Sequence, residues 1–134
     1  MLISTESISL NYVKYSETSI IVKCFTKSDG LKSYLIKGIR SSKKKSFNIG
    51  LFQPLTILEI DANHKNKGNL ESIRSAKICN SYKTIHIDIF KNSIVLFLSE
   101  VLAKSIKEEE KNIELFKFVK KSMIWLDNSE KFSN

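Results

Sequence analysis

The spacing of hydrophobic residues changes near Tyr82, and this change constrains the fold more than any other feature of the sequence. Before Tyr82, apolar residues alternate with polar ones or form short β-branched runs, a pattern typical of strands. After Tyr82, apolar residues recur every three or four positions, which is typical of amphipathic helices. The sequence therefore predicts an α+β chain in which strands come first and helices second.

Five short apolar runs precede Tyr82. We predict strands over residues 8–12, 20–26, 32–39, 52–60 and 70–78. An Asp-Gly pair between the second and third runs is a strong hairpin signal, and the widest gap lies between the third and fourth runs. Five strands with this spacing match the OB-fold, a five-stranded Greek-key barrel, although SH3-like barrels and half-sandwiches give similar patterns. We place an OB-fold domain at residues 1–80.

Two amphipathic helices are predicted in residues 81–134, which we assign to a helical domain. The first starts near Asp88, an acid suited to a helix N-terminus, and ends in the charged run 107–111. The second starts at the N-cap Asn112 and ends near residues 127–128. The expected core-facing stripe of the first helix is Phe90, Ile94, Phe97, Leu98, Val101 and Leu102. That of the second is Ile113, Phe116, Val119, Met123 and Leu126.

Positive charge is concentrated in the first part of the chain. The 134 residues carry 22 Lys and Arg against 14 Asp and Glu, a net charge of +8. Residues 1–80 hold 13 of these cations and 6 of the acids, a net of +7, whereas residues 81–134 are close to neutral. Residues 31–50 contain six cations and no acid. Such an excess favours polyanionic partners, although a solvated lysine-rich loop would give the same pattern.

Several classes of function are excluded by what the sequence lacks. No uncharged apolar stretch is long enough to span a membrane, and Glu6 interrupts the N-terminus before a secretory signal develops. Cys24 and Cys79 are too few for a disulfide framework or a four-cysteine zinc site, and we expect both to be small buried hydrophobes. His64 and His86 have no ligand spacing. We therefore expect a cytoplasmic protein without a catalytic constellation, metal or cofactor.

Several segments of the chain resemble one known family. These are residues 15–22 (YSETSIIV), 25–26 (FT), 29–31 (DGL), 35–44 (LIKGIRSSKK), 52–55 (FQPL) and 94–102 (IVLFLSEVL). Together they are similar to bacterial RecO, the family of recombination mediators, and in particular to its Bacteroidetes-type branch. The resemblance covers essentially the whole chain.

The resemblance implies an N-terminal OB domain followed by a helical domain, in a chain longer than this one. We therefore expect the helical domain to be incomplete here. Members of the family are not enzymes: they bind single- and double-stranded DNA and anneal complementary strands. With the partner RecR they help load recombinase onto strands coated by single-strand-binding protein. The resemblance also implies a cytoplasmic, nucleoid-associated protein that binds no membrane and has no small-molecule substrate.

Cations along a groove bind phosphates by releasing condensed counterions, and exposed aromatic rings stack on bases. This sequence supplies such cations and rings in three places: the third strand, the segment after it, and the loop between the last two strands. We predict a DNA-binding set of Lys32, Lys37, Arg40, Lys43, Lys44, Lys45, Lys65, Lys67 and Arg74, with Tyr34 as the stacking ring and Tyr15 next.

The second helix carries a further candidate site. Phe116, Lys120, Lys121 and Trp125 combine rings with cations, and an apolar floor with a basic rim suits the acidic, apolar tail of single-strand-binding protein. These rings are alternatively explained by packing against the rest of a longer chain. Two other functions stay open from the residues alone. One is a protein-interaction module whose charge serves only solubility, and the other is an RNA-binding barrel.

Overall fold

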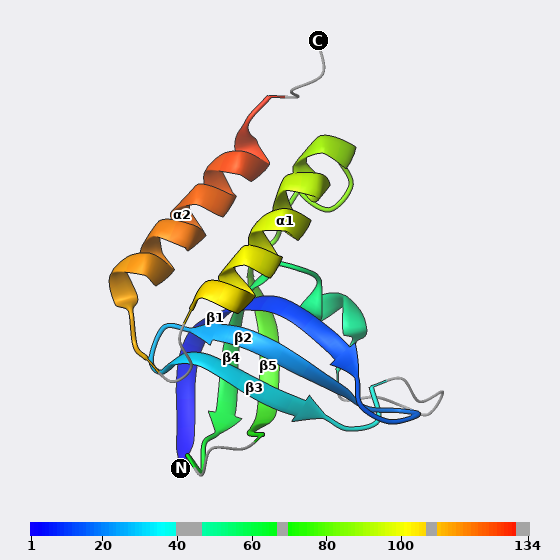
Figure 1. Ribbon diagram of the computed structural model, residues 1–134, viewed down its shortest axis with the longest axis vertical. Helices are drawn as coiled ribbons and strands as arrows, with labels where there is room; N and C mark the ends of the chain where they lie inside the picture. Colours follow the sequence, from blue (N-terminus) through cyan, green and yellow to red (C-terminus); the bar gives the residue numbers. More distant parts are fainter. Residues whose placement is uncertain (40–46, 67–69, 107–109, 131–134) are drawn as a thin grey trace.

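A computed structural model gives the fold, and it describes residues 1–39, 47–66, 70–106 and 110–130. Within these residues the first part of the chain is β-structure with one short 3₁₀ turn, η1 (Ile49–Phe52). The strands are β1 (Leu2–Lys14), β2 (Ile20–Thr26), β3 (Gly30–Ile36), β4 (Ile57–Asn63) and β5 (Ser72–Asn80). The helices are α1 (Ile89–Ser105) and α2 (Ile113–Asn128), as Figure 1 shows.

The sheet closes into a barrel with the strand order of an OB-fold. Neighbouring strands pair antiparallel in the order β3-β2-β1-β4-β5. The two outer strands then meet in parallel through Glu71, which directly precedes β5. The Leu35 N–H donates to the Glu71 carbonyl (3.0 Å), and the Glu71 N–H donates to the Ser33 carbonyl (2.9 Å). The predicted α+β fold, a five-stranded OB-fold followed by two helices, is confirmed.

Strand ends differ from the sequence prediction where polar residues or unusual backbone angles intervene. β1 begins at Leu2 rather than near residue 8, because the polar start of this strand pairs with β4; the Ser4 hydroxyl, for example, donates to Asp61 (2.6 Å). β4 begins at Ile57 rather than near residue 52. Leu55 has a φ of +58°, in the left-handed region, which interrupts the extended chain before that strand.

The predicted Asp-Gly hairpin joins β2 to β3. Gly30 has a φ of +72°, which only glycine adopts at little cost, and it pairs with Thr26 across the turn. A Cβ at Gly30 would also lie within 2.3 Å of the Glu110 backbone, so the position has no room for a side chain.

Both helices begin at the residues that the sequence indicates. The Asp88 carboxylate accepts the N–H groups of Phe90 and Lys91, and the Asn112 side chain accepts that of Leu115. Each N-cap satisfies backbone donors that a first helical turn leaves unpaired.

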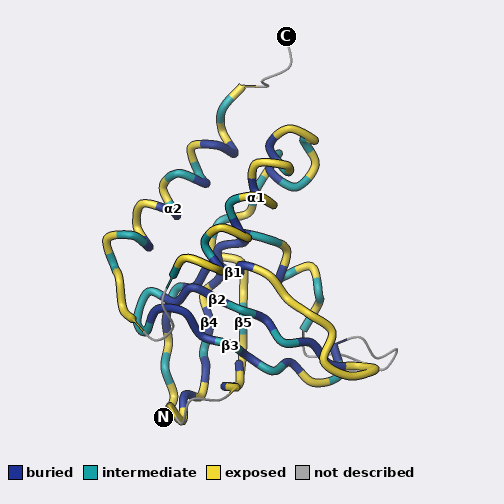
Figure 2. Tube along the Cα trace, viewed as in Figure 1, coloured by how far each residue is buried: buried dark blue, intermediate teal, exposed yellow. Residues whose placement is uncertain are grey.

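The predicted core stripe of α1 is wrong for four of its six residues, whereas Leu98 and Leu102 are partly buried and pack against the core. Phe90 and Phe97 are 51% and 68% exposed, and Ile94 and Val101 are also exposed, whereas the buried face is formed by Lys91, Val95, Ser99 and Ala103. Figure 2 shows the resulting alternation along the helix. α1 is apolar around most of its circumference, so hydrophobic spacing did not determine which side packs on the barrel.

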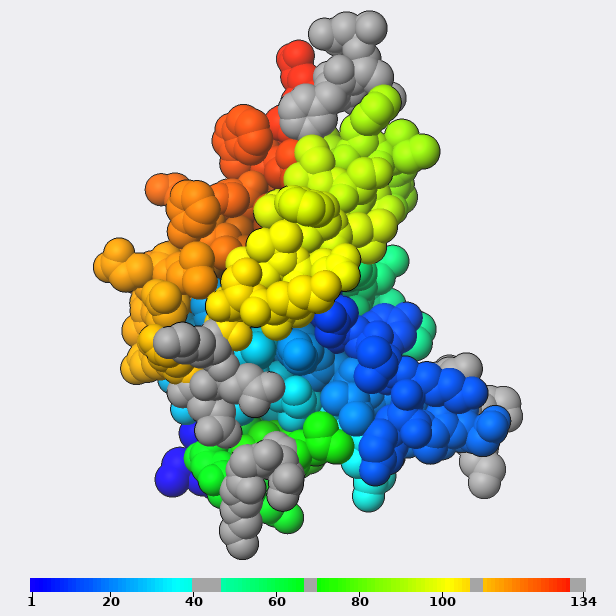
Figure 3. All heavy atoms as spheres, in the orientation of Figure 1, coloured from blue at the N-terminus to red at the C-terminus, as the bar shows by residue number. Residues whose placement is uncertain are grey.

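The predicted stripe of α2 is confirmed for four residues. Phe116, Val119, Met123 and Leu126 are buried. They belong to one core cluster with the outer faces of β1, β2 and β3, and Phe116 meets Phe25 edge-on at 5.5 Å between ring centroids. The two helices thus lie together over one part of the barrel, while the end of the β1–β2 hairpin projects away from them (Figures 1 and 3).

Asp127 fastens the end of α2 to the segment that leads into α1. Its carboxylate accepts the backbone N–H groups of Lys83, Thr84 and Ile85 at 2.8–3.2 Å. Burial alone would raise the pKa of this carboxyl, but these hydrogen bonds outweigh it and hold the pKa below its usual range. Lys91 Nζ, itself buried, donates to the Asp127 carbonyl (3.3 Å). These hydrogen bonds connect both helices to the segment that follows β5 and so hold the helix pair against the barrel.

Candidate nucleic-acid interface

A groove of about 430 Å³ lies between the end of β3 and the loop that joins β4 to β5. Lys37 follows β3 and Lys65 follows β4; both line the groove and both are exposed. They line the same groove because the barrel closes between β3 and β5 beside this loop. The apolar part of the lining includes Leu35, Phe47 and Leu70. The groove therefore has cations from two separate segments above an apolar floor, and its lining also includes Asn63, Glu71 and Ser72.

Lys32, predicted to bind DNA, is not available to a phosphate. Its side chain is 4% exposed, its Nζ donates to Asn66 Oδ1 (2.7 Å) and it lies 3.7 Å from the Glu71 carboxylate. Lys32 is on the inward-facing side of β3, opposite the buried Cys24, so the alternation of the strand directs it away from solvent. The prediction is wrong for this residue, whose charge is used inside the barrel.

Tyr34 is also buried, with no exposed surface, so it does not form a stacking platform. Its hydroxyl oxygen lies 2.7 Å from His64 Nε2, and burial is the main cause that raises the pKa of this phenol. His64 Nδ1 in turn lies 3.4 Å from Asp29. Flanking lysines had favoured an exposed ring, but the period of two places Tyr34 inside the barrel with Lys32.

Other aromatic side chains are exposed on the β1–β2 hairpin. Tyr12 is 40% and Tyr15 is 58% exposed, and Lys14 between them is exposed as well. Figure 2 shows that the end of β1 and the turn after it are exposed throughout. OB-folds use this loop and the β4–β5 loop for oligonucleotides. Phe47, half-buried in the groove, is an aromatic that sequence reasoning missed, because nothing in its spacing separates it from core residues.

The remaining predicted cations are placed as follows. Arg74 is exposed on β5 but does not line the groove. Five predicted residues lie outside the described part of the chain: Arg40, Lys43, Lys44, Lys45 and Lys67.

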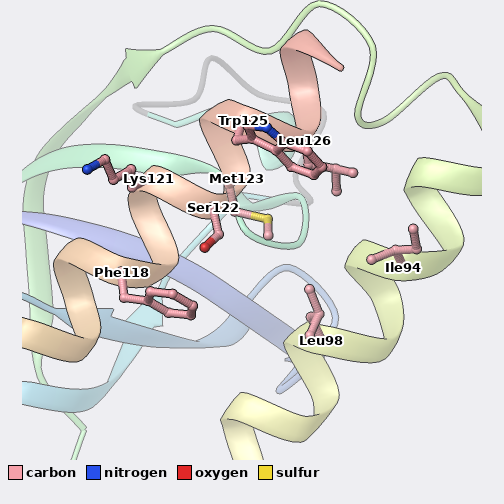
Figure 4. A pocket seen from close by; sticks show the side chains of 8 residues that line it. All are labelled: Ile94, Leu98, Phe118, Lys121, Ser122, Met123, Trp125 and Leu126. Carbon is pink, nitrogen blue, oxygen red and sulfur yellow. The ribbon is translucent and has the colours of Figure 1, made fainter. Parts of the chain in front are cut away.

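A second groove, of about 550 Å³, lies between α1 and α2 (Figure 4). Ile94 and Leu98 approach it from α1, and Phe118 and Trp125 approach it from α2. Phe118 and Trp125 are 68% and 66% exposed. Lys121 stands at the rim with its ammonium directed away from α1. The groove combines an apolar floor with at least one cation at its edge.

Two residues of the predicted partner site have other roles. Phe116 is 1% exposed and belongs to the core, where it packs against Phe25. Lys120 is paired with Glu6 of β1, which ties α2 to the barrel. The prediction of a binding role for Phe116 is wrong because the ring is buried. Lys120 does not line the groove, whereas Lys121 and Trp125 do.

In the described residues, no cluster of three or more His, Cys, Asp or Glu side chains could hold a metal ion. Over the same residues, no helix has the length and apolar character needed to cross a membrane. Cys24 is buried as expected, but Cys79 is exposed on β5, so its predicted burial is wrong.

The fold and the groove define an OB-fold protein with an appended helical segment. Comparison with known families narrows this class: residues 1–82 match the model "Recombination protein O N terminal" and residues 86–133 match "Recombination protein O C terminal". The chain belongs to the recombination protein O (RecO) family, as the resemblance implied.

Curated relatives agree with this membership. The chain is 52% identical over its whole length to proteins of Flavobacterium psychrophilum and Flavobacterium johnsoniae, and 36% identical to one of Phocaeicola vulgatus. Each of these relatives is named DNA repair protein RecO. The chain spans 56% of the length of each.

Proposed function

We propose that this chain is the DNA-binding part of a non-catalytic recombination mediator in DNA repair. It binds single-stranded DNA, and double-stranded DNA as well, through phosphate contacts with little preference for sequence. In this proposal it anneals complementary strands and, with RecR, helps load recombinase onto strands coated by single-strand-binding protein. The family membership and the names of its relatives support the role in repair.

The observation that carries the proposal is the convergence of Lys37 and Lys65 on one groove of an OB-fold. These cations come from the end of β3 and from the β4–β5 loop, the regions that OB-folds use to bind oligonucleotides. Lys32 and Glu71 are paired with each other, so Glu71 does not cancel the charge of the two exposed lysines. A backbone that follows the groove would meet both cations and an apolar floor on which bases can rest.

The size of the effect follows from counterion release. Each lost phosphate contact lowers the salt slope of single-strand binding by about 0.7. Replacing Lys37 and Lys65 with Ala therefore lowers the slope by about 1.4. Taking the two affinities as equal at about 1 M salt, this corresponds to about 60-fold weaker binding near 50 mM salt and about 10-fold near 200 mM.

The test is fluorescence anisotropy with a labelled oligothymidine of about 20 nucleotides, longer than the ~4–16 nucleotides that one OB-fold occupies. The matched control is Lys104→Ala/Lys117→Ala, which removes the same charge from exposed positions on the two helices. We expect Lys37→Ala/Lys65→Ala to lose affinity for all sequences while the control does not. Equal salt slopes for the wild type and both double variants would contradict the proposal. Adding an RNA competitor separates DNA binding from the RNA-binding alternative.

The groove between α1 and α2 supports a second function of the same mediator: docking the acidic, apolar tail of single-strand-binding protein. Trp125 is the only tryptophan of the chain and lines this groove, so its fluorescence reports occupancy directly. We expect a tail peptide to change the emission of Trp125. The Phe118→Ala variant should bind this peptide more weakly but bind the oligonucleotide as well as the wild type does. If only the peptide binds and DNA does not, the chain is a protein-interaction module instead.

A further inference from the structure

Glu71 occupies the position where the barrel closes and the nucleic-acid groove begins. Its backbone pairs with β3 on one side, and its side chain is 3% exposed. The carboxylate does not point to solvent but turns back toward the loop that leads out of β4. One oxygen accepts the Lys65 N–H (2.8 Å) and the other accepts the Asn66 N–H (3.0 Å).

These two hydrogen bonds fix the backbone of the groove lip. Asn66 has a φ of +53°, and successive N–H groups that converge in such a turn form a concavity for an anion, here filled by the Glu71 carboxylate. Burial alone would raise the pKa of Glu71, but the backbone hydrogen bonds of Lys65 and Asn66, together with Lys32, hold the pKa below its usual range. The carboxylate is therefore charged when it holds the loop.

Lys32 connects the same loop to β3. Its Nζ donates to Asn66 Oδ1 (2.7 Å) and lies 3.7 Å from Glu71, and both side chains are nearly buried. His64, which precedes Lys65, is also held in place, because its Nε2 lies 2.7 Å from the Tyr34 hydroxyl oxygen. Three consecutive residues, 64–66, are thus attached to the barrel, while the Lys65 side chain remains exposed along the groove.

We propose that Glu71 and Lys32 are positioning residues for DNA binding: without touching the nucleic acid, they hold the β4–β5 loop so that Lys65 faces the groove. This inference rests on the proposed function of that groove. The positioning role also explains why the Glu71 carboxylate is tolerated next to a site for a polyanion. Its negative charge is compensated by two backbone N–H groups and the Lys32 ammonium.

The proposal predicts an effect opposite in sign to simple electrostatics. Removing a negative charge beside a phosphate-binding groove should strengthen binding if charge alone matters. If Glu71 positions Lys65, Glu71→Gln instead loses one phosphate contact: about 8-fold weaker binding near 50 mM salt and a slope lower by about 0.7. The matched control is Glu59→Gln on β4, which removes an equal charge from an exposed ion pair with Lys77 of β5.

A second variant guards against loss of the fold. Glu71→Asp keeps the charge opposite Lys32 but shortens the side chain, so it no longer spans both N–H groups. We expect it to bind the oligothymidine as weakly as Glu71→Gln. Amide hydrogen exchange should show faster exchange at Lys65 and Asn66 in both variants, with the exchange of β1 and β2 unchanged.

The deciding measurement is a double-variant cycle with Lys65→Ala. A positioning role requires that Glu71→Gln costs nothing further once the Lys65 ammonium is gone, whereas a general structural role would cost the same in both backgrounds. Additive losses, or wild-type affinity in Glu71→Gln and Glu71→Asp, overturn the positioning role alone if Lys37→Ala/Lys65→Ala still loses binding. No binding by the wild-type chain overturns the proposed function and this inference together.

Discussion

Replacing Phe116 by Ala should destabilise the protein far more than the same change at Phe118, two residues further along α2. Phe116 is 1% exposed and meets Phe25 edge-on at 5.5 Å, while Phe118 is 68% exposed beside the inter-helix groove. The two rings have the same chemistry and the same helical backbone. They differ only in what surrounds them, which makes the pair a direct test of the packing between helices and barrel.

The magnitude follows from burial. Truncating a fully buried Phe to Ala costs about 3–5 kcal/mol, of which the edge-on ring contact accounts for about 0.5–1.5 kcal/mol. Truncating an exposed ring costs at most about 0.5 kcal/mol. For a chain of this size each kcal/mol moves the melting temperature by about 3–5 °C, so Phe116→Ala should melt about 10–25 °C below the wild type.

The assay is urea and thermal unfolding followed by far-ultraviolet circular dichroism. Phe118→Ala should unfold close to the wild type, although we expect it to weaken peptide binding in the groove. Two results would refute the reasoning: equal destabilisation by both changes, or a Phe116→Ala variant within about 1 kcal/mol of the wild type. Either would mean that α2 does not pack on the barrel through Phe116.

Two further predictions concern buried groups. Burial holds the pKa of His64 below its ordinary value of 6.5, against the opposing effect of Asp29. As the pH falls, the His64 imidazole is therefore protonated at a higher pH in the unfolded chain than in the folded protein. Stability measured by urea unfolding should therefore decrease from about pH 7.5 to about pH 5.5, and His64→Gln should lose most of this dependence; an equal decrease in the variant would contradict it. Cys24 is buried and its pKa is raised to about 12, whereas Cys79 is exposed. A thiol reagent should label Cys79 in the native protein and reach Cys24 only after unfolding, and rapid native labelling of Cys24 would show that the barrel opens.

Local patterns in the sequence were sufficient for the element order and for both helix starts. The period of two, the Asp-Gly turn and the caps Asp88 and Asn112 depend on neighbours within a few residues, and the structure confirms them. The buried stripe of α2 was predictable for the same reason, since its residues recur at helical spacing. The family resemblance also lay in contiguous segments, which the family models match.

Which face of each element is covered was decided only by the tertiary structure. α1 is apolar on several sides, and contact with the barrel selects Val95 and Ala103 over Phe90 and Phe97. Lys32, Lys37 and Lys65 are the same residue type in basic segments, yet barrel closure encloses the first with Glu71 and brings the other two to one groove. The amino-acid composition alone gives the number of cations that the chain carries. Long-range pairing through Glu71 places the end of β3 beside the β4–β5 loop, and no local pattern encodes that proximity.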